Sequence, residues 1–237
     1  MVNSVRAHDL LWLGLPGALQ TAPEAAGESG HAALLDRAPW LTPAWLADAP
    51  VVVRRAAGPA GWLPVGLRGR LRAERCAAWL PARTVRRCVT PEHIARSQAW
   101  REPSASQQVA AVAAIGPIAA VLNDEGVRWG IGGGVGFALA TNLPVLRPDS
   151  DLDLIVRADD EDEFMRAARA LNKVLDNIAD TTTAPIRIDV QIDTPAGGFA
   201  FAEWQRTGGP VMLKTADGPL LLSDPWQVEI TTPMTVS

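Results

Sequence analysis

The chain has 237 residues, of which 48% are hydrophobic and 20% charged, and its formal net charge is −4. This length supports a sizeable core in one or two domains, and no apolar run approaches the roughly 20 residues of a membrane-spanning helix. The acidic balance argues against nucleic acid as the main partner. The N-terminal residues lack a signal-peptide pattern, and Cys76 and Cys88 match no metal-binding spacing, so we expect a cytoplasmic protein with reduced thiols and no membrane attachment.

The first 50 residues predict little regular structure. Two short apolar pieces, residues 10–15 and 40–46, are separated by a Gly/Ala/Glu stretch over residues 22–32 that is typical of a loop.

Residues 51–90 predict the rest of a small, basic, β-rich N-terminal domain over residues 1–90. Residues 51–54 and 61–68 are expected to be antiparallel strands. Residues 73–80 are expected to form a short helix that Pro81 stops. The following residues, 91–106, are polar with two prolines and are interpreted as a linker.

Positive charge is concentrated in this N-terminal domain. Residues 51–90 contain nine arginines and one acidic residue, Glu74, so the segment carries +8 and the rest of the chain −12. Guanidinium groups bind phosphate and carboxylate in bidentate fashion, which suits a polyanionic ligand or an acidic protein. A solvated surface is the alternative, because Lys173 and Lys214 are the only lysines and arginine is the ordinary cation of this chain.

Residues 107–237 alternate between helices and strands. Pro117 predicts a kink in the first helix, because proline has no N–H to donate, and Asp217-Gly218 predicts a hairpin turn. The acidic run 159–163 opens a helix, where it complements the helix dipole, and is interpreted as structural. The expected elements are a helix 107–122, a strand 127–131, a glycine turn with a short helix 137–141, a strand 151–156, a helix 159–178, a strand 186–192 and a hairpin 211–222.

Asp151 and Asp153 are the most informative residues of the chain. They flank Leu152 at the start of an apolar strand, and since side chains alternate along a strand, both carboxylates leave the same face. Two carboxylates this close repel each other unless a cation lies between them, and oxygen ligands favour Mg²⁺ or Mn²⁺. Asp189, isolated on the polar face of the strand 186–192, supplies a third carboxylate. The sequence lacks the downstream glutamate and glycine of an EF-hand calcium loop.

A glycine run, Gly132-Gly133-Gly134-Val135-Gly136, precedes these carboxylates. Backbone N–H groups at such a turn can approach a phosphate. The run is not a P-loop, because no Lys-Ser or Lys-Thr follows, and it does not match the dinucleotide-binding fingerprint. Glycines and carboxylates together predict metal-assisted transfer of a phosphate-bearing group.

The glycine turn, the string Ser150-Asp151-Leu152-Asp153 and Asp189 resemble the polymerase-β-type nucleotidyltransferase superfamily over roughly residues 107–193. The resemblance implies an α+β fold, in which a nucleotidyltransferase-type mixed sheet flanked by helices occupies residues 107–237 after the basic N-terminal domain. The distance from the glycines to Asp151 is long for that superfamily, which leaves open which two glycines form the phosphate-binding pair.

The whole chain is similar to a narrower family, the phosphoribosyl-dephospho-CoA transferases of malonate decarboxylase, also called holo-acyl-carrier-protein synthases. The similarity rests on four strings: His8-Asp-Leu-Leu-Trp-Leu13, Val65-Gly-Leu-Arg-Gly-Arg70, Asp149-Ser-Asp-Leu-Asp-Leu154 and Val211-Met-Leu-Lys-Thr-Ala-Asp-Gly-Pro219. It implies 2′-(5″-triphosphoribosyl)-3′-dephospho-CoA as the donor substrate, a serine of the apo acyl carrier protein subunit as the acceptor, and pyrophosphate as the leaving group.

The resemblance also implies roles for particular residues. Asp151, Asp153 and Asp189 are the expected catalytic and metal-binding residues, with Mg²⁺ or Mn²⁺ as cofactor, and Asp189 is also a candidate base for the serine proton. The expected substrate-binding residues are Gly132, Gly133, Gly134, Ser150, Lys214, Arg68 and Arg70. Ser150 either binds phosphate or caps the strand, Lys214 either binds phosphate or snorkels to the surface, and Arg68 and Arg70 are assigned to the CoA moiety or the carrier. His8, His31 and His93 are interpreted as ordinary core, surface or loop residues.

Two alternatives stay open from the sequence. A nucleotidyltransferase acting on a small molecule such as an aminoglycoside would share the carboxylates but would not need the basic N-terminal domain. An antitoxin-like or regulatory protein of the same fold would be non-enzymatic, but such proteins often lack one of the three carboxylates that this chain retains.

Overall fold

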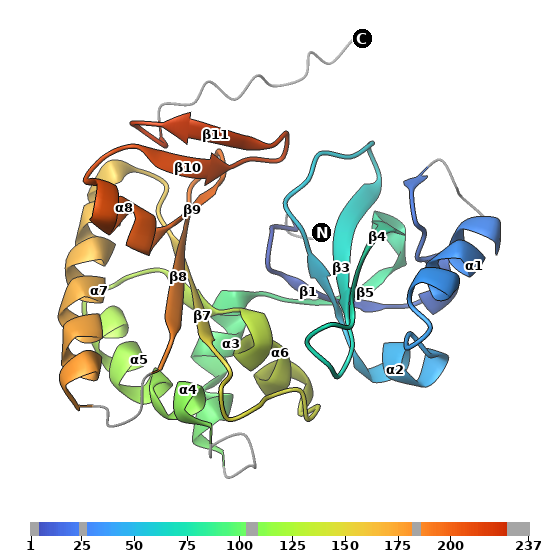
Figure 1. The fold of residues 1–237 in the computed structure, drawn as a ribbon, viewed down its shortest axis with the longest axis horizontal. Coiled ribbons are helices and arrows are strands. Elements are labelled where there is room, and N and C mark those ends of the chain that lie inside the picture. Colours follow the sequence, from blue (N-terminus) through green and yellow to red (C-terminus); the bar gives the residue numbers. More distant parts are fainter. Residues whose placement is uncertain (1–4, 24–27, 103–108, 182–185, 227–237) are drawn as a thin grey trace.

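The protein has two halves, each built around its own β-sheet, which face each other across the middle of the molecule (Figure 1). The computed structural model describes residues 5–23, 28–102, 109–181 and 186–226. Within these residues the N-terminal sheet has the order β4-β3-β2-β1-β5 and the C-terminal sheet the order β11-β10-β9-β8-β7-β6. The expected α+β architecture, with a β-rich N-terminal part and a mixed sheet with helices after it, is confirmed.

The N-terminal sheet is antiparallel throughout. Its inward side chains, such as Leu11, Val51 and Val65, are fully buried. The elements of this half are β1 (Leu10–Leu13), η1 (Pro16–Ala18), α1 (Glu28–Arg37), α2 (Pro43–Asp48), β2 (Val51–Val53), β3 (Trp62–Arg68), β4 (Arg75–Pro81), η3 (Ala82–Thr84) and β5 (Val85–Val89).

Two expectations for this half are wrong. The helix expected over residues 73–80 is instead strand β4, which pairs with β3 in the register Ala78↔Val65 and Leu80↔Leu63. Burial of Ala78 and Leu80 against this partner outweighs the helix preference of the segment. The loop expected over residues 22–32 ends at α1, so His31 lies on a helix, with Nδ1 3.0 Å from the carbonyl oxygen of Leu19.

The segment expected to be a linker begins with packed structure. Residues 91–101 form α3 (Pro91–Ser97) and η4 (Ala99–Arg101). The side chain of Thr90 caps α3 by accepting the His93 N–H at 3.1 Å. Helix α3 packs on β6, where a Cβ on Gly130 would lie 2.6 Å from Pro91 Cβ, so residues 91–101 are not an irregular connection. Residues 103–108 lie outside the described part of the chain.

The C-terminal half contains the predicted helices in the predicted order, but the short helix begins at Gly133 instead of residue 137, and the strand over residues 198–200 and the helix over residues 201–207 were not predicted. Its elements are α4 (Ala110–Ala113), α5 (Ile115–Asp124), β6 (Trp129–Ile131), α6 (Gly133–Thr141), β7 (Leu152–Arg157), α7 (Glu161–Thr181), β8 (Ile188–Asp193), β9 (Gly198–Ala200), α8 (Phe201–Thr207), β10 (Val211–Lys214) and β11 (Pro219–Leu222). The expected kink is a break at Ala114, because the ring of Pro117 excludes a regular turn at the carbonyl of Ala113. Helices α5 and α7 pack together beside the sheet (Figure 1).

Strands β7 and β8 are parallel neighbours, and their pairing positions the candidate site. The register places Asp153 beside Asp189 and Arg157 beside Asp193. One face of this pair is apolar and fully buried at Leu152, Leu154, Val156 and Ile192. Because side chains alternate, the polar residues of both strands share the opposite face.

The described residues contain no helix that is both long and apolar enough to cross a membrane.

Candidate active site

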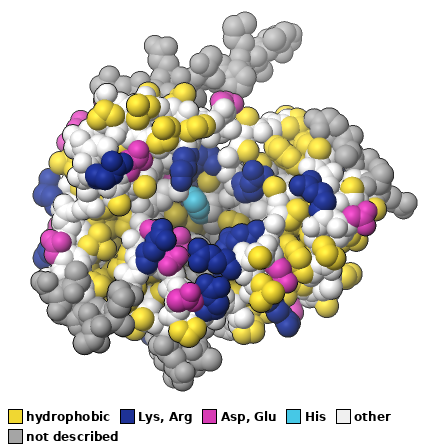
Figure 2. Space-filling view, viewed as in Figure 1, with side chains coloured by type: hydrophobic (Ala, Val, Ile, Leu, Met, Phe, Trp, Pro, Cys, Tyr) yellow, Lys and Arg dark blue, Asp and Glu magenta, His cyan; other side chains and the backbone are white. Residues whose placement is uncertain are grey.

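A cavity of about 750 Å³ is lined by side chains of both halves. The N-terminal half contributes basic residues, among them Arg54, Arg68 and Arg75, while the C-terminal half contributes Asp153 and Asp189 from the polar face of β7 and β8. Figure 2 shows this hollow, with basic side chains gathered around acidic ones. The cavity therefore places cations of one half opposite carboxylates of the other.

The glycine turn packs directly against Asp153. The Gly132 N–H donates to the backbone carbonyl of Asp153 at 2.9 Å, and α6 begins at the next residue. Gly133 has a φ of +55°, and a Cβ there would overlap the Asp153 carboxylate and lie 2.8 Å from Asp153 Cβ. Gly133 is therefore required both by its left-handed backbone and by the close approach of Asp153.

The three predicted carboxylates share one electrostatic environment. Burial raises the pKa of Asp153, and the negative charges of Asp189 and Asp151 raise it further, while Arg68 lowers it. Asp189 is 47% exposed and forms an ion pair with Arg187 at 3.1 Å. Asp151 precedes β7 and is absent from the cavity lining. The structure thus brings Asp153 and Asp189 together in the cavity, with Asp151 beside them.

The same three carboxylates are the predicted metal ligands. The donor set is entirely carboxylate oxygen, which suits a hard divalent cation. In the described part of the chain, however, no three His, Cys, Asp or Glu side chains converge closely enough to hold an ion. The carboxylate of Asp189 is paired with the guanidinium of Arg187. The carboxylate oxygens are suitable ligands for Mg²⁺ or Mn²⁺, but in the structure the three side chains do not converge on one position.

The two predicted arginines have different surroundings. Arg68 lines the cavity and lies over Phe137, with its Cζ 5.5 Å from the ring centroid, and burial lowers its pKa to about 10. Arg70 instead lies over Trp45 in a separate hollow that contains Glu74. Of these two arginines, Arg68 is the one placed to meet a ligand in the cavity.

The remaining predicted site residues differ in whether they line the cavity. Lys214, Gly132 and Gly133 line the cavity. Gly134 faces Arg68, whose Nη2 would be 3.0 Å from a Cβ at that position. The Ser150 hydroxyl accepts the Arg147 N–H at 2.9 Å and closes a turn outside the cavity lining. In the structure, Ser150 is therefore a turn residue.

Several lining residues were not singled out from the sequence. Arg54, Arg75, Arg187, Gln191 and His8 all reach the cavity. Gln191 had a detectable signal, since it alternates with Asp189 on the polar face of β8. His8 had none, because the fold brings it to β8 from 183 residues away.

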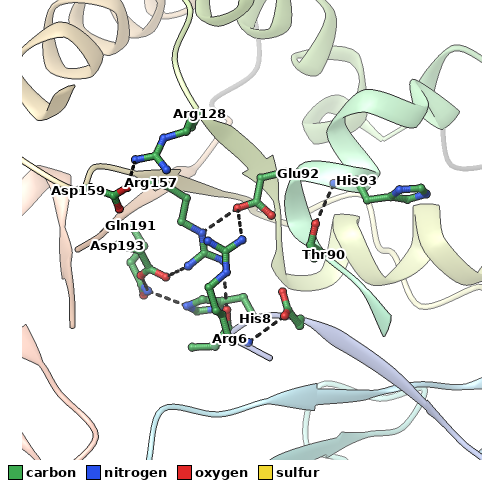
Figure 3. Close-up of polar contacts among 12 residues, drawn as sticks. Arg6, His8, Thr90, Glu92, His93, Arg128, Arg157, Asp159, Gln191 and Asp193 are labelled. Atoms are coloured by element: carbon green, nitrogen blue, oxygen red, sulfur yellow. Dashed lines mark hydrogen bonds and ion pairs between the residues drawn. The ribbon is translucent and has the colours of Figure 1, made fainter. Parts of the chain in front are cut away.

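An ionic cluster with a buried centre at Arg157 and Asp193 joins the two halves next to this cavity (Figure 3). Arg157 is bonded to Asp193 and, through Nε, to Glu92 Oε1 at 2.8 Å. From the N-terminal half, Arg55 reaches Asp193 at 2.7 Å and Arg6 reaches Glu92 at 3.3 Å. Burial alone would raise the pKa of Glu92, but the hydrogen bond and charge of Arg157 hold it below its ordinary value. The cluster fixes both walls of the cavity relative to each other.

Comparison with known proteins places this geometry in a family. Residues 6–91 match the model of the phosphoribosyl-dephospho-CoA transferase MdcG N-terminal domain, and residues 96–225 match that of the C-terminal domain. No solved structure gives a significant match.

Three relatives, each named phosphoribosyl-dephospho-CoA transferase, match over nearly their whole length. The protein of Klebsiella pneumoniae (strain 342) is 38% identical over 97% of this chain and 100% of its own. That of Pseudomonas putida (strain W619) is 39% identical over 96% and 98%, and that of Azotobacter vinelandii is 37% identical over 93% of each. The chain belongs to the MdcG family of phosphoribosyl-dephospho-CoA transferases.

Proposed function

We propose that this protein transfers the phosphoribosyl-dephospho-CoA group from 2′-(5″-triphosphoribosyl)-3′-dephospho-CoA to a serine of the apo acyl carrier protein subunit of malonate decarboxylase. The observation that carries the proposal is the cavity between the halves, where the carboxylates of β7 and β8 face a basic wall. A donor with a triphosphate group needs both cations to bind it and acidic groups to assist its reaction.

The reaction is a displacement at phosphorus. The serine oxygen forms a bond to the α-phosphorus, the bond from that phosphorus to the pyrophosphate oxygen breaks, and the serine proton passes to a base. Asp189 is the proposed base, because its carboxylate is exposed in the cavity. Arg68, Arg75 and Lys214 would bind the triphosphate and stabilise the charge of the leaving pyrophosphate.

Mg²⁺ or Mn²⁺ is part of this proposal. Asp151 and Asp153 would hold the ion, joined by Asp189 when its ion pair with Arg187 opens. A bound cation would neutralise charge on the triphosphate and the leaving group. Burial and the charges of Asp189 and Asp151 raise the pKa of Asp153, and a bound cation would offset both effects on the ionised carboxylate.

Seven of the nine arginines of residues 51–90 fall into two groups by position, while Arg55 belongs to the ionic cluster and Arg70 to the separate hollow. Arg54, Arg68 and Arg75 line the cavity and are assigned to the CoA-containing donor. Arg72, Arg83, Arg86 and Arg87 are exposed and absent from the cavity lining. We assign this outer group to the carrier protein, on the reasoning that an acidic partner would bind it.

The test is a reconstitution with purified components. Protein, Mg²⁺, donor and apo carrier subunit are incubated, and the carrier's intact mass and released pyrophosphate are measured. The proposal expects one phosphoribosyl-dephospho-CoA group per carrier, equimolar pyrophosphate, and no modification when the carrier serine is alanine. The Asp153→Asn variant should be folded and inactive. An unmodified carrier with verified substrates would overturn the proposal, and turnover of ATP without a carrier would favour a small-molecule nucleotidyltransferase.

A further inference from the structure

His8 has an unusual backbone conformation for a residue with a side chain. It is the third residue of a turn in which the Asp9 N–H donates to the Arg6 carbonyl at 3.2 Å, and its φ is +77°. Such a φ is favoured by glycine and is uncommon for a residue with a side chain, so it costs free energy unless the surroundings hold it. Strain of this kind persists where the surroundings impose it, and it often marks a functional position.

The surroundings that impose this conformation are the two halves of the molecule. The His8 N–H donates to the Val53 carbonyl at 3.0 Å on one side. On the other side, Arg157 donates to the carbonyl of Ala7 at 3.5 Å, so the ionic cluster also anchors the turn. The imidazole is thereby held against β8 in the wall of the cavity (Figure 3).

Gln191 determines which nitrogen of His8 carries the proton. The Gln191 Nε2 lies 2.6 Å from Asp193 Oδ1 and 2.7 Å from His8 Nε2. A carboxylate accepts only from the amide NH₂ group, so this nitrogen is correctly placed and its second hydrogen points to His8. His8 Nε2 is then the acceptor, and the single ring proton resides on Nδ1. No hydrogen-bond partner of Nδ1 occurs among the described residues.

The electrostatics agree with a neutral ring. Burial lowers the pKa of His8, the Asp193 charge raises it, and Arg55, Arg157 and Lys214 lower it. Arg55 and Arg157 are paired with Asp193, whereas Lys214 lines the cavity together with His8. A neutral N–H donor beside this lysine is a favourable place for a phosphate oxygen.

We propose that His8 is a substrate-contacting residue whose Nδ1–H, fixed by Gln191, donates a hydrogen bond to a phosphate oxygen of the bound donor. This inference rests on the proposed function for the identity of the donor. The role differs from that of the carboxylates, because His8 binds the donor and takes no proton.

The tautomer is tested first, without any substrate. The ring nitrogens of ¹⁵N-histidine-labelled protein are observed by NMR, and His8→Gly assigns the His8 signals among the three histidines. The expected result is a protonated Nδ1 and an unprotonated Nε2 at pH 7, with the Nε2–H form increasing in Gln191→Leu. A His8 ring protonated on Nε2 in the wild type would overturn the proposal.

Binding of the triphosphoribosyl-dephospho-CoA donor is then measured by calorimetry with Mg²⁺ and no carrier. His8→Gly keeps the backbone conformation and removes the donor, so we expect unchanged or higher stability and about 10- to 100-fold weaker binding. His8→Asn suits a positive φ and retains an N–H near the Nδ1 position, so most of the affinity should return. His93→Gln, at an exposed histidine, should have no effect.

The outcomes separate this proposal from the proposed function. Equal donor binding by wild type and His8→Gly would overturn the role of His8 and leave the transferase reaction intact. If the His8 variants weaken donor binding as expected but the wild-type protein does not modify the carrier, the transferase reaction is refuted and the His8 contact stands. A wild-type protein that does not bind the donor would overturn both.

Discussion

Replacing Gly133 by alanine tests whether the glycine turn positions Asp153. Alanine at a φ of +55° should lower the free energy of unfolding by about 1–2 kcal/mol. The new Cβ would also lie 2.8 Å from Asp153 Cβ and overlap the carboxylate. Since Asp153 Cβ is itself too close, a change of rotamer cannot relieve the overlap, and β7 and α6 must move apart. A displacement of about 1 Å in a catalytic group reduces turnover by about 10²-fold.

Gly126→Ala is the matched control for this change. Gly126 has a φ of +64° but no atom within 4 Å of a built Cβ, so it should show the same backbone strain without moving Asp153. Urea denaturation measures the stability of both variants, and the rate of carrier modification measures turnover. We expect similar losses of stability and a loss of activity in Gly133→Ala alone. Equal activities in the two variants would refute the positioning role of Gly133.

The remaining predictions concern charge. In EDTA at pH 7, Asp153→Asn should raise the free energy of unfolding, because the raised pKa of Asp153 means that its ionisation disfavours the folded state. The gain should disappear below about pH 4, where the unfolded aspartate is protonated; urea titrations that show no pH-dependent difference would contradict it. Arg157→Met should cost about 3–5 kcal/mol by leaving buried Asp193 and Glu92 short of a partner. Arg147→Met, at an exposed pair with Asp149, should lower the free energy of unfolding by less than about 1 kcal/mol in the same titration. Similar losses in the two variants would contradict the stabilising role of Arg157 in the ionic cluster.

Local sequence patterns predicted most of the C-terminal half. The alternation of Val190 and Ile192 with Gln191 identified β8 and its polar face, because a period of two is a property of the strand itself. Strand β4 was not predicted, since Ala77 and Ala78 favour a helix and only pairing with β3 makes them a strand.

The candidate site was predictable to a similar degree. Asp153 and Asp189 become neighbours through the parallel register of β7 and β8, which a helix between two strands makes probable from sequence. Strand β3 ends at residue 68 as predicted, but the different placements of Arg68 over Phe137 and Arg70 over Trp45 depend on tertiary packing, which has no local signal. The contacts of Arg55 with Asp193 and of His8 with Gln191 join positions 138 and 183 residues apart, so only the folded chain brings them together.

The ionic cluster between the halves also limits how this family can exchange parts. Asp193 and Glu92 take cations from both sides, and Arg6 and Arg55 are the contributions of the N-terminal half. Consider a hybrid that receives residues 1–90 from a relative without cations at positions 6 and 55. Both of its sheets would still fold, but the ion pairs that hold the two sheets in position relative to each other would be missing. The N-terminal half and the half that bears the carboxylates must therefore change together at these positions, even where these residues touch no substrate.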